Sequence, residues 1–359
     1  MPISRRALLL VAGAAPLGPG ARAEVTYATV TPRPLVFPRD HGAHPDYRTE
    51  WWYLTGWLDA RGEAPVGFQV TFFRFRTSTE PSPSRFSPSQ LVIAHAAIAS
   101  PARGALLHDE RAQRVGFGLV EASTEDTDLR LDRWRFVRDV ESGEYRGTIP
   151  ARSFDLTLSA RPTQPLLLQG LDGFSQKGPQ PTQASHYYSQ PQLAVRATLR
   201  LDGATREANG IAWLDHEWSS SVLDADAVGW DWIGMNLDDG SALMAFQIRS
   251  TVAGRIVHRY ASLRPAGGAV RVYEGDAVRF EAASTWRSPR TNAAYPVAQG
   301  IRVGDRMFET RPLMNDQELD SRVSTGSVYW EGASTLLEGG RTIGRGYLEM
   351  TGYVAPMKL

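Results

Sequence analysis

One short segment of the sequence brings together three side-chain types that can do chemistry: a carboxylic acid, an imidazole and an indole. Its four consecutive residues are Asp215, His216, Glu217 and Trp218. Because side chains alternate between the two faces of a β-strand, His216 and Trp218 share one face, and Asp215 takes the other with Glu217. We expect the side chains of His216 and Trp218 to point into the barrel. Asp215 could reach the same side only if a β-bulge interrupted the strand. The predicted catalytic residues are therefore His216, Trp218 and Asp215.

The reaction that fits such a group is the addition of water to an unactivated carbon–carbon double bond. It needs a strong proton donor, a cavity that stabilises a tertiary carbocation, and a water delivered to that cation. A carboxylic acid or an imidazolium in an apolar pocket can donate the proton, and aromatic faces stabilise a cation by about 0.5–2 kcal/mol each. Around this group we predict four substrate-binding residues: Tyr187, Tyr188, Trp230 and Asp231. Alternatively, Trp230 packs in the core and His216 has a structural role.

Other chemistries have little support in the sequence. The chain contains no Cys, which excludes disulfides, thiolate nucleophiles and Cys-ligated metal centres. The motifs of serine hydrolases, phosphate-loop enzymes and zincins are absent. His41 and His44 are three residues apart, but they lie in a Pro- and Gly-rich segment typical of a turn, so we predict no metal and no cofactor. The 39 basic residues balance 39 acidic ones, which leaves no basic surface for nucleic acid.

The first residues have the features of an export signal. Arg5 and Arg6 precede an apolar stretch that ends in an A-x-A cleavage pattern at residues 21–23. The arginine pair fits a twin-arginine signal, although a Sec signal also tolerates it. Pro and Gly within residues 16–20 interrupt the run before it reaches the roughly 20 apolar residues that a membrane anchor needs. We therefore predict that residues 1–23 are removed and that the mature protein is periplasmic or otherwise exported, with no stable transmembrane anchor.

An internal repeat organises the rest of the chain. Five residues recur 178 positions later without a gap, so that Trp52, Gly56, Gly62, Phe68 and Gln69 match Trp230, Gly234, Gly240, Phe246 and Gln247. The match predicts two copies of one domain, with Trp52 and Trp230 at equivalent positions of equivalent strands. Adding 178 to the first mature residue gives residue 202, so we expect domains at residues 24–201 and 202–359.

Each copy is predicted to consist of β-strands. Residues 52–58 and 67–72 alternate in polarity around a turn, and residues 230–237 and 243–249 flank a tighter turn that contains Asp-Gly. No segment shows twelve residues of clean helical periodicity. Short strands separated by Gly, Pro and Asp turns suit antiparallel barrels or sandwiches, and barrels leave no exposed edge. The predicted fold class is all-β, with two antiparallel barrels.

Several motifs, most of them rich in Trp, extend from the first predicted strand to the C-terminus. They are E-W-W-Y-L-T-G at 50–56, G-F-Q at 67–69, A-H-A-A-I at 94–98, Y-Y-S-Q-P at 187–191, W-L-D-H-E-W-S at 213–219, G-W-D-W at 229–232 and G-Y-L-E-M-T-G-Y at 346–353. Together they resemble the AttH/CrtC lipocalin-like family from about residue 35 onward. The resemblance implies two tandem lipocalin-like antiparallel β-barrel domains packed together.

The resemblance implies two classes of function. The family includes carotenoid 1,2-hydratases (hydroxyneurosporene synthases), exported members of unknown activity, and fungal relatives that are pericyclic cyclases of polyketide chains. In the hydratases an acid and a tyrosine after the second hairpin act with the His-x-Trp pair, but residues 243–248 contain neither, which leaves Asp215, Asp231 and Glu217 as substitute acids. We therefore expect an exported protein that binds a long apolar lipid or isoprenoid, as a partner of an ABC-type exporter. A hydro-lyase acting on an isoprenoid chain is the alternative.

Overall fold

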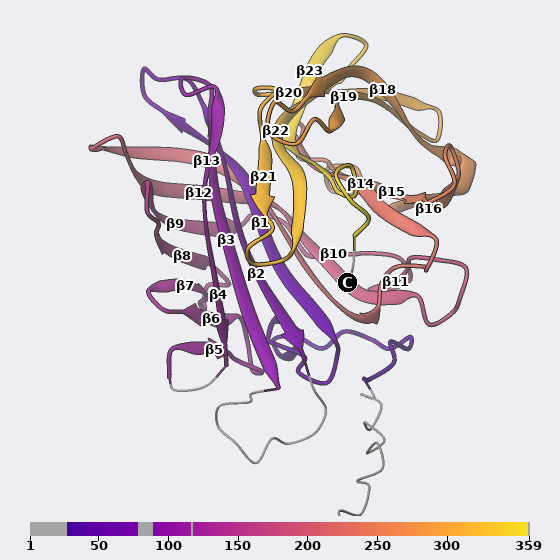
Figure 1. Ribbon diagram of the computed structural model, residues 1–359, viewed down its shortest axis with the longest axis horizontal. Coiled ribbons are helices and arrows are strands. Elements are labelled where there is room, and N and C mark those ends of the chain that lie inside the picture. Colours follow the sequence, from indigo (N-terminus) through magenta and orange to yellow (C-terminus); the bar gives the residue numbers. More distant parts are fainter. Residues whose placement is uncertain (1–26, 78–88, 116–117, 358–359) are drawn as a thin grey trace, which may run out of the picture.

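The computed structural model describes residues 27–77, 89–115 and 118–357, and these residues are almost entirely β-structure (Figure 1). The predicted export signal at residues 1–23 lies outside them. The helical elements among the described residues are single 3₁₀ turns, η1 (Arg39–His41) and η2 (Gly275–Ala277). Within the same residues, no helix has the length and apolarity that crossing a membrane requires. The predicted all-β class is confirmed.

The first sheet curls into a nearly closed barrel of thirteen strands among the described residues. They are β1 (Thr49–Ala60), β2 (Val66–Arg76), β3 (Gln90–Ser100), β4 (Ala105–Arg114), β5 (Val120–Ala122), β6 (Asp128–Leu131), β7 (Trp134–Arg138), β8 (Tyr145–Pro150), β9 (Phe154–Pro162), β10 (Leu167–Leu168), β11 (Phe174–Gln176), β12 (Ala184–Leu201) and β13 (Ala204–Ser221). Their order is β4-β3-β2-β1-β13-β12-β9-β8-β7-β6-β5, and β10 and β11 pair with β12. The barrel encloses an apolar core that includes Trp52 and Trp134.

The second sheet contains ten strands and curls less completely, beside the first sheet in Figure 1. They are β14 (Ala227–Leu237), β15 (Ala242–Ser250), β16 (Ile256–Arg264), β17 (Arg271–Glu274), β18 (Val278–Arg287), β19 (Ala294–Val303), β20 (Arg306–Pro312), β21 (Glu318–Ser321), β22 (Ser327–Glu338) and β23 (Arg341–Met350). Their order is β17-β16-β15-β14-β23-β22-β20-β19-β18, with β21 paired to β22. Its own core includes Ile233, Leu243 and Trp330. The two barrel-like sheets confirm the predicted architecture.

The two sheets repeat one order of strands, but the repeated residues do not superpose as predicted. β1 lies between β2 and β13 in the first sheet, as β14 lies between β15 and β23 in the second. Trp52 and Trp230 therefore occupy equivalent strands. However, Trp52 faces the core of its own barrel, whereas Trp230 packs against the apolar cluster between the sheets. The predicted equivalence of position is wrong. The residues that face the core of their own sheet are even-numbered in β1 but odd-numbered in β14. Because the offset of 178 is even, it matches an inward residue of β1 with an outward residue of β14.

The chain passes from one sheet to the other later than the repeat predicts. Strand β13 pairs with both β1 and β12, so the hairpin of β12 and β13 belongs wholly to the first sheet. The second sheet begins with β14, and the crossing lies at residues 222–226 rather than at residue 202. A hydrogen-bonded hairpin of two 18-residue strands is a single unit, and its turn at residues 202–203 is no boundary between sheets.

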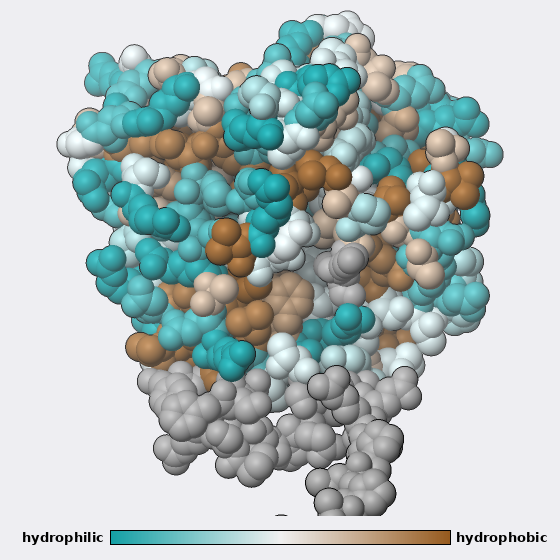
Figure 2. Space-filling view, in the orientation of Figure 1, coloured by the Kyte–Doolittle hydropathy of each residue, from teal (hydrophilic) through white to brown (hydrophobic). Residues whose placement is uncertain are grey.

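The sheets are joined by a third apolar cluster made from the outer faces of both. It includes Tyr53, Trp57 and Trp213 from the first sheet and Trp232 and Phe246 from the second. Three outward residues of β1, Trp51, Tyr53 and Trp57, are therefore aromatic, unlike the polar residues typical of a sheet face in water. Figure 2 shows apolar side chains in the hollow between the two halves of the molecule. The packing of one sheet on the other creates the space described next.

Candidate active site

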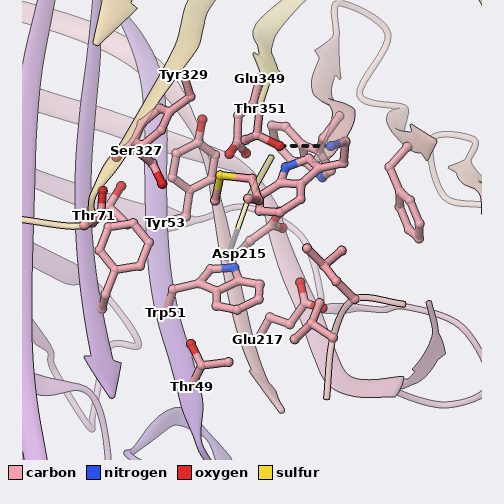
Figure 3. A pocket seen from close by; sticks show the side chains of 18 of the residues that line it. Thr49, Trp51, Tyr53, Thr71, Asp215, Glu217, Ser327, Tyr329, Glu349 and Thr351 are labelled. Atoms are coloured by element: carbon pink, nitrogen blue, oxygen red, sulfur yellow. Dashed lines mark hydrogen bonds between the residues drawn. The ribbon is translucent and has the colours of Figure 1, made fainter. Parts of the chain in front are cut away.

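A cavity of about 160 Å³ lies between the two sheets, on the outer face of the first barrel (Figure 3). Its wall combines aromatic and aliphatic side chains with a group of acids and one lysine. The polar and charged residues of the wall include Lys177, Tyr187, Asp215, Glu217, Tyr329, Glu331 and Glu349, and the apolar ones include Trp51, Tyr53, Phe73, Trp230, Trp232, Phe246 and Ile248. Because a buried carboxyl group is costly unless paired or neutral, this concentration of acids marks a functional site.

Strand β13 supplies Asp215 to the cavity. Its carboxyl accepts hydrogen bonds from Tyr187 Oη (2.6 Å), Ser189 Oγ (2.5 Å) and Trp213 Nε1 (2.7 Å). Burial raises the pKa of Asp215 to about 7 in spite of these donors. Trp232 Nε1 in turn donates a hydrogen bond to Tyr187 Oη at 3.1 Å. Hydrogen bonds therefore link Asp215 to Tyr187 and Tyr187 to the indole of Trp232. The chain of contacts fixes the rings that form one side of the cavity.

Two further acids lie side by side on neighbouring strands of the second sheet. Glu331 on β22 lies opposite Glu349 on β23 in the register of the strands. Burial raises the pKa of Glu349 to about 8, and the negative charges of Asp215 and Glu217 add to the shift. Burial and the charge of Glu349 raise the pKa of Glu331 well above its ordinary value. Since two close carboxyl groups cannot both ionise cheaply, the pair keeps a proton at neutral pH.

Three polar atoms of the cavity wall lack a protein partner among the described residues. Thr49 Oγ1, the Tyr53 hydroxyl and Oε2 of Glu331 are buried, and none of them makes a hydrogen bond there. A buried polar atom left unpaired costs about 1–3 kcal/mol. Such atoms are expected where a ligand or water supplies the missing partner.

The predicted pair of His216 and Trp218 shares one face, as expected, but that face is not the one that lines the cavity. His216 is fully buried on the barrel side of β13 and stacks on Trp52 at 4.4 Å between ring centroids. Trp218 stacks on His44 at 3.8 Å. The prediction that both line the cavity is therefore wrong. Alternation along β13 turns Asp215 and Glu217 toward the second sheet instead, and the register of β13 with β1 contains no bulge.

The predicted binding residues are likewise divided between faces. Tyr187 and Trp230 line the cavity, whereas Tyr188 lies on the barrel side, directly opposite His216 in the register. Tyr188 Oη contacts His216 Nδ1 at 3.1 Å, which fulfils the expectation that the two lie together. Asp231 is separate from both groups, since it accepts hydrogen bonds from Gln247 and Tyr353 on the other side of β14. Asp231 therefore does not line this cavity.

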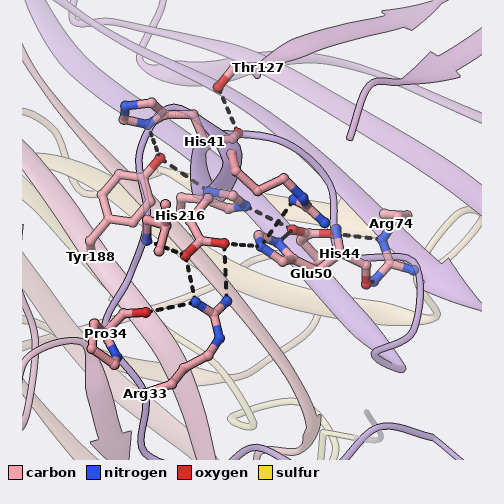
Figure 4. Close-up of polar contacts among 12 residues, drawn as sticks. Arg33, Pro34, His41, His44, Glu50, Arg74, Thr127, Tyr188 and His216 are labelled. Atoms are coloured by element: carbon pink, nitrogen blue, oxygen red, sulfur yellow. Dashed lines mark hydrogen bonds and ion pairs between the residues drawn. The ribbon is translucent and has the colours of Figure 1, made fainter. Parts of the chain in front are cut away.

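His216 belongs to a buried polar network at one end of the first barrel (Figure 4). Glu50 is its centre: Oε1 contacts His44 Nδ1 at 2.7 Å and His216 Nε2 at 2.9 Å, and Oε2 accepts from Arg74 Nε at 2.7 Å. Although burial opposes its charge, the Arg74 guanidinium and both imidazoles hold the pKa of Glu50 well below its ordinary value. Burial lowers the pKa of His216 to about 4, so this imidazole is neutral at pH 7.

The same network contains a set of atoms that could bind a metal. One ligand atom from each of His44, Glu50 and His216 lies within 4.8 Å of the others. However, hydrogen bonds already connect the three side chains, and Arg74 and Arg33 pair with the carboxylates of Glu50 and Asp40. A divalent ion would add positive charge to a buried cluster whose carboxylates are already neutralised. The arrangement therefore fits a structural polar core better than a metal centre.

Sequence reasoning missed three residues of the cavity: Lys177, Glu331 and Glu349. Glu349 lies within the motif G-Y-L-E-M-T-G-Y, and Glu331 follows V-Y-W at 328–330, so both are acids within largely apolar segments of the sequence. A charged residue in a strand with apolar neighbours on both sides is a signal that could have found them. Lys177 follows the short strand β11 and had no comparable signal.

Known proteins are similar to this chain in sequence and in fold. The family model described as AttH-like matches residues 28–353. The crystal structure of an AttH protein from Nitrosomonas europaea is 51% identical, with a TM-score of 0.86 over 91% of this chain and 100% of that one. Kievitone hydratase from Nectria haematococca matches at 13% identity and a TM-score of 0.67, over 92% and 97%. CghA with Sch210972 matches at 13% and 0.51, over 86% and 89%. No curated protein matches the sequence.

Proposed function

Because this chain belongs to the AttH-like family, we propose that it is a hydro-lyase that adds water to a carbon–carbon double bond of an apolar, isoprenoid-like molecule. One observation carries the proposal. Glu331 and Glu349 keep a proton at neutral pH in a cavity walled by aromatic rings, which gives the reaction a protonated carboxylic acid as its proton donor. The name of the fungal neighbour with this fold, kievitone hydratase, supports the same class of reaction.

The first step is the transfer of a proton from Glu349 to one carbon of the double bond. The new C–H bond uses the π electrons and leaves a positive charge on the more substituted carbon. Trp230 and Trp232 line the cavity beside the acids, and each indole face stabilises such a charge by about 0.5–2 kcal/mol. The carboxylate that remains on Glu349 attracts the cation in a site that excludes most water.

Water then completes the addition. Its oxygen forms a C–O bond with the cation, and its extra proton passes to the carboxylate pair, which restores the starting state. The unpaired Tyr53 hydroxyl and Glu331 Oε2 are the atoms that can hold this water before it reacts. In total one alkene and one water give one tertiary alcohol, and no cofactor takes part.

The size of the cavity limits the substrate. A water-sized atom occupies about 10–15 Å³ of such a volume, so about 160 Å³ admits about a dozen atoms. A second hollow of about 330 Å³ adjoins the cavity, since both are lined by Thr49, Val222, Leu223 and Met357. We infer that the double bond and its neighbouring isoprene units enter the cavity, while any longer chain remains in the hollow.

The test is incorporation of oxygen from labelled water. The purified protein is incubated with myrcene or farnesene in H₂¹⁸O, and mass spectrometry measures the ¹⁸O-labelled tertiary alcohol. We expect turnover by the wild type and a loss of at least a hundredfold in Glu349→Gln, because the amide cannot donate the proton. Glu309→Gln is the matched control, since Glu309 is an exposed glutamate on β20 of the same sheet and does not line the cavity.

The carrier expected from the sequence is the alternative outcome of this experiment. Both terpenes bind but gain no ¹⁸O at any pH from 5 to 8 if the protein only transports its ligand. In that case Glu349→Gln binds them as well as the wild type does. An exporter that receives the ligand belongs to this alternative and would be sought among membrane proteins that crosslink to the loaded protein.

A further inference from the structure

Lys177 is exceptional among the basic residues of this chain. Only two of the 39 basic residues are lysines, Lys177 and Lys358, and Lys358 lies outside the described residues. A guanidinium stays protonated and is not a nucleophile, whereas a lysine amine can lose a proton and attack a carbonyl carbon. An amine at position 177 can therefore do chemistry that the arginines used elsewhere could not.

Lys177 is buried at the wall of the cavity and is not a surface charge. Its side chain is 6% exposed and lines the cavity between the sheets. Its ammonium nitrogen lies 4.5 Å from the ring centroid of Tyr187 and 4.4 Å from that of Phe246. Two aromatic faces therefore separate the nitrogen from water and leave its third side to the cavity.

A carboxylate is placed to exchange a proton with this amine. Nζ of Lys177 lies 3.0 Å from Oε1 of Glu217. The same oxygen accepts a hydrogen bond from Ser185 Oγ at 2.5 Å, which fixes the carboxylate. The cost of desolvating a buried ion pair can exceed its Coulombic gain, so pairing alone does not explain why a lysine lies at the wall of an apolar cavity.

We propose that Lys177 captures apolar aldehydes as a protonated imine, with Glu217 as proton acceptor and then as counter-ion. The ammonium gives one proton to Glu217, and the free amine forms a C–N bond with the aldehyde carbon while the carbonyl oxygen takes up that proton. The second N–H proton passes through Glu217 to the resulting hydroxyl group. Water leaves, and the nitrogen forms a C=N double bond. One ammonium and one aldehyde give one iminium and one water, so charge and atoms balance.

The cavity favours one chemical class of aldehyde. Its wall near Lys177 is apolar and aromatic, so the remainder of the ligand must be a hydrocarbon chain or an isoprenoid. The volume of about 160 Å³ fits a chain of about ten carbon atoms by the estimate above. The capture depends on the cavity alone and uses neither Glu331 nor Glu349. A saturated aldehyde has no carbon–carbon double bond, so hydration has no part in the test, and the two proposals can fail separately.

The experiment traps the imine by reduction. The protein is incubated with decanal and sodium cyanoborohydride, and peptide mass spectrometry locates the decyl groups on lysines and on the terminal amine. We expect labelling of Lys177 at least tenfold faster than that of Lys358, which serves as the reference amine in the same molecule. Excess 1-decanol, which fills the cavity without reacting, should slow labelling of Lys177 and leave Lys358 unaffected.

Variants give the second arm. Lys177→Arg keeps the positive charge beside Glu217 and should abolish labelling in the cavity, while 1-decanol still binds the variant in isothermal titration calorimetry. Glu217→Gln should slow trapping at least tenfold, because the proton acceptor is lost. Equal labelling of both lysines without competition by decanol would overturn the proposal. So would the absence of label on Lys177 in wild-type protein that binds decanol in the same calorimetric measurement, a result that needs no variant to fold.

Discussion

Two neighbouring residues of one strand illustrate how burial sets the chemistry of this protein. The pKa of Asp215 rises to about 7 and that of His216 falls to about 4, and burial is the main cause of both shifts. Burial disfavours the charged form of either group, so the acid gains a proton to donate and the imidazole loses one. At neutral pH the acids of the cavity, rather than the histidine, therefore carry the protons that the proposed reaction requires.

Replacing Glu349 should make stability depend less on pH. Its pKa is raised from 4.5 in the unfolded chain to about 8 in the folded protein. Between these values the folded state holds a proton that the unfolded state has lost, so wild-type stability falls as pH rises through this window. Glu349→Gln has no such penalty, and its free energy of unfolding relative to wild type should increase from pH 5 to pH 8. At about 1.4 kcal/mol per pH unit, the increase over these three pH units is about 4 kcal/mol at most.

Urea unfolding at pH 5, 6, 7 and 8 measures this difference. Glu309→Gln serves as the control, and its exposed side chain should give a difference from wild type that does not change with pH. A constant difference for Glu349→Gln as well would mean that the acid pair is ionised in the folded protein at neutral pH.

At the scale of elements, β12 and β13 connect two environments that hardly mix. One face of these strands carries His216, Trp218 and Tyr188 into the polar network of the barrel, while the other carries Asp215 and Tyr187 into the cavity. Side-chain alternation makes this division automatic in a strand that is buried on both faces. The same stretch of these two strands therefore supplies the buried polar network on one face and the cavity wall on the other.

The approach of the second sheet depends on a glycine in β2. A methyl group on Gly67 would lie 2.5 Å from Cβ of Ala333 and 2.7 Å from the Tyr347 hydroxyl, both on the second sheet. Gly67→Ala should therefore push the sheets apart and destabilise the protein by about 1–3 kcal/mol. Thermal unfolding followed by circular dichroism measures the loss. Gly300→Ala in β19 is the control, since a methyl there meets one atom at 3.9 Å, and its melting temperature should not fall.

At the scale of the whole molecule, the cavity belongs to neither sheet alone. Asp215 and Glu217 come from the first sheet, Glu331 and Glu349 from the second, and the aromatic wall from both. The cluster between the sheets contains Trp57, Trp213 and Phe246, so a buried apolar contact joins the two sheets. We expect the two halves to act as one unit, because separating them would expose this cluster and open the site.

The export of the whole molecule remains a prediction from the sequence. If the peptidase cleaves after the A-x-A pattern, the mature chain begins at Glu24. N-terminal sequencing of protein recovered from the periplasm measures this directly. Replacing Arg5 and Arg6 by Lys should block export by the twin-arginine route, whereas unchanged export would indicate the Sec route. Periplasmic protein that retains both arginines would contradict cleavage altogether.

The sequence by itself determined the class of fold, the family and the sidedness of one strand. Alternating apolar residues and Asp-Gly turns predicted antiparallel strands, and the Trp-rich motifs identified the AttH-like family, which the family model confirms. Alternation also placed His216 and Trp218 on one face and Asp215 on the other, as observed. These properties follow from local geometry, because the alternation of side chains with a period of two residues can be read from the order of residues.

Only the tertiary structure decided which face carries the cavity. Alternation says which side chains lie together but not what packs against them, and both faces of β13 are buried. The cavity exists because the second sheet docks on the outer face of the first, and its strands β22 and β23 bring Glu331 and Glu349 to Asp215 across more than a hundred residues of sequence. Such an encounter depends on how two curved sheets fit together, which no local pattern of residues encodes.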